Sequence, residues 1–173
     1  MATEKSNTST AQLDFSTFQQ QVLNDYQLAC ESREASLLGR KEVLTGKAKF
    51  GIFGDGKELA QIALAKQFRN GDFRSGYYRD QTLMLAIDAL TLEQYFSGLY
   101  AHTDHHVEPQ SAGRQMGGHY ATRNLDEQGH WKNLMEQKNS SSDISPTGGQ
   151  MPRLLGLAQA SKVYREHPTL KEL

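Results

Sequence analysis

Apolar residues recur at helical spacing along much of the chain. Near the N-terminus a stripe with intervals of three and four residues is formed by Phe15, Phe18, Val22, Tyr26 and Ala29. This period predicts an amphipathic helix over residues 16–38. The helix is expected to begin with the sequence STFQ at 16–19, which has the form of a capping box.

Four more helices are predicted from the same kind of pattern. They cover residues 57–68, 80–89, 92–100 and 149–165. The helix over 57–68 should turn Leu59, Ile62 and Ala63 inward, and Thr91 to Gln94 form a second capping box. Asn70 and Gly71 are expected to end the helix before them. The last helix carries an apolar face made of Met151, Leu154, Leu155 and Ala158.

The remaining segments are mostly irregular. Residues 102–143 are polar, contain glycine and show little periodicity, so we expect a long loop that either serves a site or is disordered. Strand-like pieces are short and lie near 73–78 and 141–144. The polar residues 1–12 predict a disordered tail, and residues 13–173 form the rest of the chain. Helix should therefore exceed strand by a wide margin.

Composition excludes several classes of protein. The 173 residues carry a formal net charge of −1 with scattered Lys and Arg, which gives no nucleic-acid or membrane-surface signature. The single cysteine, Cys30, cannot form an intramolecular disulfide and suits a reducing cytoplasm. No apolar run approaches the roughly 20 residues of a membrane span.

Three segments carry the candidate chemistry: YYRD at 77–80, which follows Gly76, and the glycine-containing GRQMGGHY at 113–120 and SPTGGQMP at 145–152. Glycine lets the backbone approach a ligand closely. A Tyr-Arg pair such as Tyr78 and Arg79 can hold a phosphate, because the guanidinium donates two parallel hydrogen bonds and the phenol adds a third. His119 is suited to moving a proton near neutral pH. Together these segments indicate a phosphate-bearing cofactor with proton chemistry beside it.

With FGIFGDGKELAQIALA at 50–65, these motifs resemble the alpha portion of the thiamine-diphosphate-dependent 2-oxoacid dehydrogenases, over residues 49–164. Within that family the chain is most similar to the branched-chain (2-oxoisovalerate) dehydrogenases. The resemblance implies an α/β fold of the thiamine-diphosphate-binding type, a parallel sheet with helices on both faces. Residues 13–173 would hold the mostly helical N-terminal part of that thiamine-diphosphate-binding domain, truncated before its Mg²⁺-binding motif. It also implies oxidative decarboxylation of a 2-oxoacid with acyl transfer to a lipoyl group; pyruvate and acetoin dehydrogenases are the alternatives.

The resemblance also implies roles for individual residues. It places cofactor binding at Tyr78, Arg79, Ser145 and Thr147, substrate binding at Phe50, Tyr78, Met116 and His119, and catalysis at His119. Threonine at 147 replaces the family's usual aliphatic residue. Gly117 stands where proline is usual, which predicts a more flexible loop before His119.

Cofactors and partners follow from the same resemblance. It implies thiamine diphosphate with Mg²⁺, whose ligands are expected beyond Leu173, so that the chain alone is expected to be inactive. Gly54-Asp55-Gly56 is interpreted as a turn before a helix and not as the metal motif. Expected partners are a beta subunit or remaining half of the enzyme and a lipoyl acyltransferase. An exposed apolar face around Leu154, Leu155 and Leu157 predicts self-association.

Two interpretations from other classes stay open. His102, His105 and His106, with Asp104 and Glu108 nearby, could hold a transition metal, since imidazole and carboxylate are suitable ligands. Alternatively, the chain could be a non-catalytic helical interaction module that uses Phe15, Phe18 and Val22 as an exposed stripe.

Overall fold

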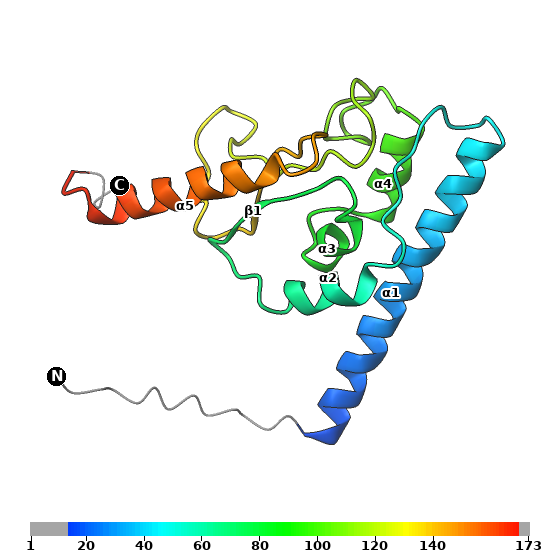
Figure 1. Cartoon of the computed structure of the whole chain (residues 1–173), viewed down its shortest axis with the longest axis horizontal. Helices are drawn as coiled ribbons and strands as arrows, with labels where there is room; N and C mark the ends of the chain where they lie inside the picture. The colour runs from blue at the N-terminus through cyan, green and yellow to red at the C-terminus, as the bar shows by residue number, and fades with distance from the viewer. Residues whose placement is uncertain (1–13, 170–173) are drawn as a thin grey trace.

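The computed structural model describes residues 14–169, and Figure 1 shows them as a small central body from which two long helices extend. The elements are, in chain order, α1 (Phe15–Leu44), α2 (Glu58–Ala65), β1 (Phe73–Ser75), α3 (Gln81–Ala86), α4 (Leu92–Leu99), β2 (Asn139–Ser141) and α5 (Gln150–Glu166). Each of the five predicted helices is present. The predicted disordered tail over residues 1–12 lies outside the described residues.

The first helix begins and ends elsewhere than the sequence predicts. Asp14 is its N-cap, because the carboxylate accepts hydrogen bonds from the backbone N–H groups of Ser16 and Thr17 at 2.9 and 3.0 Å. The predicted capping box at residues 16–19 is therefore wrong, and the helix runs on to Leu44. The capping box at Thr91 and Gln94 is confirmed at the start of α4.

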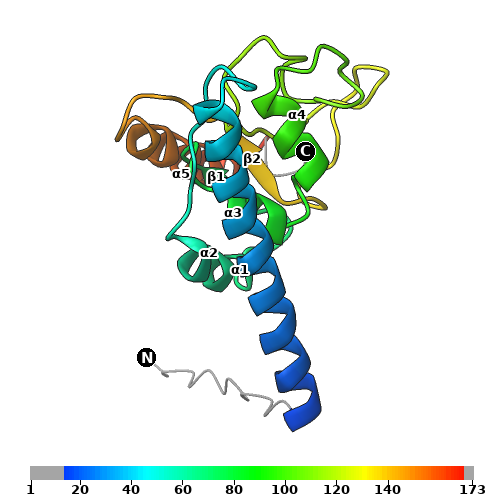
Figure 2. The same ribbon diagram turned by 90° about the vertical axis from the view of Figure 1, so that its right-hand side faces the viewer.

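The predicted apolar stripe on α1 does not form the buried face of this helix. Phe15, Phe18, Val22 and Tyr26 are exposed, and Figure 2 shows that half of α1 projecting away from the body. The buried face lies further along and consists of small or polar residues, namely Ser32, Ala35, Ser36, Gly39 and Glu42. Small side chains allow α1 to approach α3 closely.

Polar contacts join α1 to α3 at that face. The Ser32 and Thr82 hydroxyls lie 2.6 Å apart, and the side-chain amide of Gln81 donates to Ser36 Oγ at 2.7 Å. An apolar cluster continues behind this seam and includes Ala35, Leu83, Met84, Ile87, Leu90, Tyr95 and Tyr120. The core thus lies between the second half of α1, α3 and α4.

The buried face of α2 is also more polar than predicted. Ile62 is buried as expected, but Leu59 is 76% exposed and Ala63 is exposed as well. Gln61 takes the inward position because its amide accepts from Leu83 N at 2.9 Å and donates to the Arg79 carbonyl at 3.0 Å. Tertiary hydrogen bonds to the polypeptide after β1 therefore override the apolar pattern.

The sheet has two short parallel strands. Phe73, Arg74 and Ser75 of β1 pair with Asn139, Ser140 and Ser141 of β2, in that order. β1 lies inside the predicted strand-like piece, whereas β2 begins two residues before the predicted one. Helix α5 contacts β1, while α2 and α3 pack on α1. The described residues therefore form a mainly helical structure around a parallel two-stranded sheet, compatible with part of an α/β fold.

Residues 102–143 are mostly irregular, as predicted. The exceptions are β2 and an isolated bridge between Leu125 and Trp131. The buried carboxylate of Glu108 organises part of it by accepting from the backbone N–H groups of Gln110, Ser111 and Gly113 at 2.8–3.1 Å.

The last helix is largely open to solvent. None of the residues of α5 is buried; Leu154 and Leu155 are exposed as predicted, and Leu157 is partly exposed. Self-association through this face stays a prediction. Within residues 14–169, none of the helices combines the length and the apolar character needed to cross a membrane.

Candidate functional site

Two of the three motif segments meet because the strands before them are parallel. Tyr77, Tyr78 and Arg79 follow β1 after one intervening residue, and Ser145 and Thr147 follow β2. Parallel strands have their carboxyl ends at the same edge of a sheet, where ligands of α/β proteins commonly bind. The hydroxyls of Tyr77 and Thr147 lie 3.4 Å apart, so the two segments are in contact.

His119 brings the third motif segment to the same place. Its Nε2 lies 2.7 Å from Ser145 Oγ, and its Nδ1 lies 3.0 Å from the carbonyl oxygen of Met116. A carbonyl can only accept, so Nδ1 carries a proton and donates it to Met116. In the neutral ring Nε2 is then an acceptor, and the Ser145 hydroxyl donates to it. The structure thereby fixes one tautomer of a largely buried imidazole.

Gly118 explains why the polypeptide before His119 needs glycine. Its φ is +88°, and a Cβ at this position would lie 2.8 Å from the carbonyl oxygen of Tyr78. A side chain at this position would therefore clash with backbone atoms of the Tyr-Arg segment. It would also disfavour the positive φ that the backbone has here. This close approach brings the Tyr78 and His119 rings to a centroid distance of 6.2 Å.

The Tyr-Arg segment forms a compact aromatic and cationic surface. The rings of Tyr77 and Tyr78 have centroids 3.8 Å apart, and their hydroxyls are hydrogen-bonded to each other. The Arg79 guanidinium lies 5.6 Å and 5.3 Å from these two ring centroids. Among residues 14–169, Arg79 makes no ion pair, so its charge faces the site without a protein counter-ion.

The structure therefore brings together Tyr78, Arg79, Met116, His119, Ser145 and Thr147. Phe50 is the predicted site residue that stands apart. It is about half exposed, in the segment between α1 and α2. No hydrogen bond or aromatic contact links it to the other site residues within the described part of the chain.

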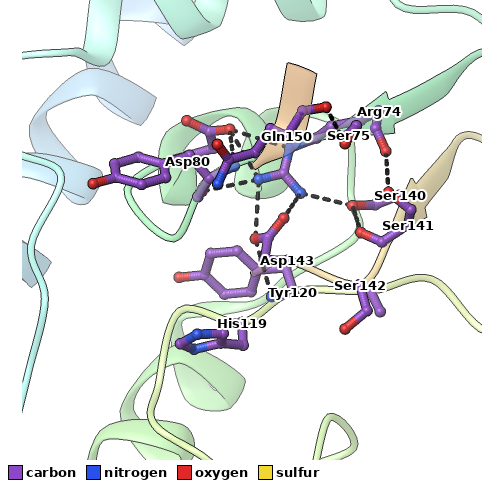
Figure 3. Close-up of polar contacts among 12 residues, drawn as sticks. Arg74, Ser75, Asp80, His119, Tyr120, Ser140, Ser141, Ser142, Asp143 and Gln150 are labelled. Atoms are coloured by element: carbon purple, nitrogen blue, oxygen red, sulfur yellow. Dashed lines mark hydrogen bonds and ion pairs between the residues drawn. The ribbon is translucent and has the colours of Figure 1, made fainter. Parts of the chain in front are cut away.

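Figure 3 shows a buried charge network beneath the site that the sequence interpretation missed. Arg74, in the centre of β1, has a side chain only 5% exposed. Its guanidinium lies 2.9 Å from Asp80 Oδ2 and 3.0 Å from Asp143 Oδ1, and it donates to Ser140 Oγ at 2.6 Å. The one available signal was a charged residue in the middle of a strand-like segment, where an unpaired charge would be costly.

Asp143 is the most buried member of this network. Burial raises the pKa of its carboxyl group, and the adjacent Arg74 guanidinium counteracts that rise only in part. Oδ2 accepts from Arg74 Nη2 at 3.1 Å and from the backbone N–H of Tyr120 at 3.2 Å. Oδ1 is close enough to Arg74 for an ion pair but lacks the alignment of a hydrogen bond.

The Gly54-Asp55-Gly56 segment forms a turn before α2, as predicted. Asp55 is paired with Arg40 at 2.6 Å, and Gly56 has a φ of +93°. Glu58, at the first residue of α2, accepts from the Gly56 N–H at 3.0 Å and is paired with Arg33. Both carboxylates thus have structural partners.

The His-rich metal cluster that the sequence left open as an alternative is only partly assembled. Asp104, His105 and His106 place one possible ligand atom each within 4.8 Å of the others, and all three are exposed. His102 Nδ1 accepts from the Asp104 backbone N–H at 3.2 Å. Glu108 is committed to the loop amides described above and belongs to no such group among the described residues. Its proposed part in a metal site is therefore wrong.

Comparison with known proteins gives one informative result. No protein-family model matches the chain. Over 123 residues the chain is 31% identical to a Bacillus subtilis protein, the 2-oxoisovalerate dehydrogenase subunit alpha. The matched segment covers 70% of this chain and 32% of the length of that subunit. The resemblance predicted from the motifs is thus confirmed, and the chain is related to the alpha subunits of 2-oxoacid dehydrogenases.

Proposed function

We propose that this chain supplies the part of a 2-oxoacid dehydrogenase that binds the diphosphate of thiamine diphosphate and places His119 beside the reacting substrate. The observation that carries this proposal is the junction of three motif segments at the carboxyl ends of β1 and β2. There His119 is hydrogen-bonded to Ser145 at 2.7 Å, next to Tyr78 and Arg79.

The groups at this junction suit a diphosphate. Arg79 offers a cation that has no ion-pair partner among residues 14–169, and the hydroxyls of Tyr78 and Thr147 are nearby donors. The turn before the 17-residue helix α5 includes Gly148, at φ +85° with open space where a Cβ would be, so a ligand can approach its backbone. The N-terminus of α5 adds a partial positive charge.

When bound, thiamine diphosphate supplies the electron sink for decarboxylation, and the protein supplies binding and positioning. In that arrangement Tyr78, Arg79, Ser145 and Thr147 hold the cofactor. Threonine at 147 offers a hydroxyl where the family usually has an aliphatic side chain, which favours polar contact over an apolar wedge. The Mg²⁺ ion that accompanies the diphosphate in this family takes no ligand from these residues in our proposal.

His119 is placed to hold or release a proton at Nε2. Nδ1 stays bonded to the Met116 carbonyl whether the ring is neutral or charged. When Nε2 gains a proton it becomes a donor, and Ser145 Oγ changes from donor to acceptor across the same 2.7 Å. His119 can therefore bind a substrate carboxylate and assist proton movement during acyl transfer to a lipoyl group.

The substrate proposal favours branched-chain 2-oxoacids. The Bacillus subtilis relative is named for 2-oxoisovalerate. Met116, which is roughly half exposed, offers apolar surface to an aliphatic acyl group. Pyruvate and acetoin dehydrogenases are the alternatives within the family. Because the relative is a subunit, we also propose a partner subunit and, for the complete reaction, a lipoyl acyltransferase.

To test the proposal, the isotopically labelled chain is titrated with thiamine diphosphate and Mg²⁺ while the NMR signals of its backbone amides are recorded. We expect shift changes concentrated at residues 77–80, 117–120 and 145–150. Arg79→Ala should weaken binding about tenfold or more, since a charge-assisted hydrogen bond contributes about 1.5–3 kcal/mol. Arg165→Ala, at the far end of α5, makes the same charge change and should leave binding unaltered. The proposal would be rejected if the amide signals of these segments did not shift at ligand concentrations up to about 10 mM, which corresponds to roughly the weakest binding of interest.

A further inference from the structure

Two rungs of hydrogen bonds hold the His119 loop against the segment that follows β2. The outer rung is the bond between His119 Nε2 and Ser145 Oγ at 2.7 Å. The inner rung joins the neighbouring residues. Asp143 Oδ2 accepts from the Tyr120 N–H at 3.2 Å, and the Asp143 N–H donates to the Tyr120 carbonyl at 3.1 Å. The position of the outer rung therefore depends on the inner one.

Arg74 fixes the inner rung to the rest of the site. Its Nη2 donates to Asp143 Oδ2 at 3.1 Å and to the Tyr77 carbonyl at 3.0 Å, one residue before Tyr78. Its Nη1 donates to Ser140 Oγ on β2. A single guanidinium thus contacts the Tyr-Arg segment and the β2 segment directly, and reaches the His119 loop through Asp143 (Figure 3).

Burial makes this arrangement rigid. The Arg74 side chain is 5% exposed and that of Asp143 is fully buried. Neither group can exchange its partner for water, and an uncompensated charge at such depth is strongly unfavourable. The hydrogen bonds of these two side chains include none to the Arg79 side chain or to the Ser145 hydroxyl. We therefore assign Arg74 and Asp143 no direct part in binding a ligand.

We propose that Arg74 and Asp143 are positioning residues of the candidate site, and that their pair sets the distance of the His119–Ser145 hydrogen bond, while the Met116 carbonyl holds the tautomer. The consequence for cofactor binding rests on the proposed function, while the effect on His119 does not. In Asp143→Asn one carboxylate oxygen becomes an NH₂ group. In either orientation of the amide the NH₂ group faces a donor: Arg74 Nη1 if it takes the Oδ1 position, or Arg74 Nη2 and the Tyr120 N–H if it takes the Oδ2 position. The charge that pairs with Arg74 is also lost, so the inner rung is weakened while side-chain size is kept.

The experiment measures the ¹⁵N resonances of the His119 ring in the full chain. In the wild type we expect separate signals for a protonated Nδ1 and an unprotonated, hydrogen-bonded Nε2. In Asp143→Asn the Nε2 signal should move towards the position of an unprotonated nitrogen without a hydrogen bond, while the Nδ1 signal, which depends on the Met116 carbonyl, should change less. Glu58→Gln is the matched control, because it also neutralises a carboxylate paired with arginine, between α1 and α2. It should lower stability without changing the His119 signals.

A second variant covers the case in which Asp143→Asn does not fold. Ser140→Ala removes only the hydroxyl that accepts from Arg74 at 2.6 Å and should shift the His119 signals in the same direction by a smaller amount. Unchanged His119 signals in a folded Asp143→Asn chain, or in Ser140→Ala when Asp143→Asn is unfolded, would overturn the proposal.

Titration with thiamine diphosphate separates this proposal from the proposed function. Asp143→Asn should weaken binding about tenfold if both are right. A wild type that binds nothing while Asp143→Asn still alters His119 would reject the proposed function and keep the positioning role. Equal binding by the wild type and Asp143→Asn, with identical His119 signals, would keep the function and reject the positioning role.

Discussion

The ion pair between Glu58 and Arg33 should make stability depend on pH in an acidic range. The Glu58 carboxylate accepts from Arg33 Nε at 2.8 Å and from Nη2 at 2.9 Å, and also from the Gly56 N–H. Hydrogen bonding from Arg33, followed by that of nearby backbone N–H groups, lowers the pKa of Glu58 from 4.5 to about 2, against the opposing effect of burial. Glu58→Gln keeps the side-chain size and removes the charge.

The size of the effect follows from the pKa shift. Each pKa unit corresponds to about 1.4 kcal/mol, so the shift sets an upper bound of roughly 3.5 kcal/mol. Arg33 is 47% exposed, and solvent screening reduces the contribution of such a pair. We therefore expect Glu58→Gln to lower the free energy of unfolding by about 1–2 kcal/mol at neutral pH.

The sign of the pH dependence is fixed by the lowered pKa of Glu58 in the folded state. The stabilisation is complete above pH 4.5, where the carboxyl group is charged in both the folded and unfolded chain, and is lost as the pH falls towards about 2. The difference between wild type and Glu58→Gln should narrow over this range.

Urea unfolding followed by helical circular dichroism at several pH values between about 7 and 3 would measure this difference. Glu127→Gln, at an exposed loop position, is the control and should differ little from the wild type at each pH. A Glu58→Gln difference that stays constant over this range would refute the reasoning.

Two further substitutions test the core and the site loop. Met84→Ala, at a fully buried position, should lower the free energy of unfolding by about 2–5 kcal/mol in urea denaturation, whereas Met151→Ala on the exposed face of α5 should change it by less than ~0.5 kcal/mol. Gly118→Ala should move the His119 loop as well as lower stability, because its Cβ would press on the Tyr78 carbonyl. Gly56→Ala has a similarly positive φ but open space, so it should lower stability by about 1 kcal/mol or more and leave the site's NMR signals unchanged.

Local signals in the sequence predicted local structure well. The capping box at Thr91 and Gln94 uses residues three apart, and it forms as predicted. Helical periods located all five helices, with ends displaced by a few residues. The start of α1 differs from the predicted one because Asp14, and not Ser16, supplies its cap. The contacts of a helix cap join residues that are only two or three positions apart, so they can be predicted from the sequence alone.

The buried faces of the helices could not be predicted in the same way. Ser36 and Gln61 are buried because each has a hydrogen-bond partner far away in the sequence. Leu59 is exposed although the apolar pattern predicted that it would face inward. A period shows which residues share a face, but it does not show whether the neighbouring element offers apolar or polar groups.

The candidate site shows the same division. The motifs predicted candidate site residues that the structure brings close together, such as Tyr78 and His119. They did not identify Arg74 and Asp143, which lie 69 positions apart in the sequence and meet only because β1 and β2 pair in parallel. Pairing of this kind is a property of the tertiary structure.

The arrangement of the site also explains how a short sheet can hold several ligand-binding side chains in fixed positions. Ser145 and Thr147 are exposed and therefore available to a ligand, whereas the residues that hold their segment are buried. Loops that carry binding groups usually need a rigid scaffold beneath them. Two strands of three residues offer few backbone hydrogen bonds for that purpose. The guanidinium of Arg74 adds bonds that cross from one strand segment to the other, and Asp143 extends them to the histidine loop. The geometry that we assign to cofactor binding thus depends on side-chain bonds as well as on the sheet.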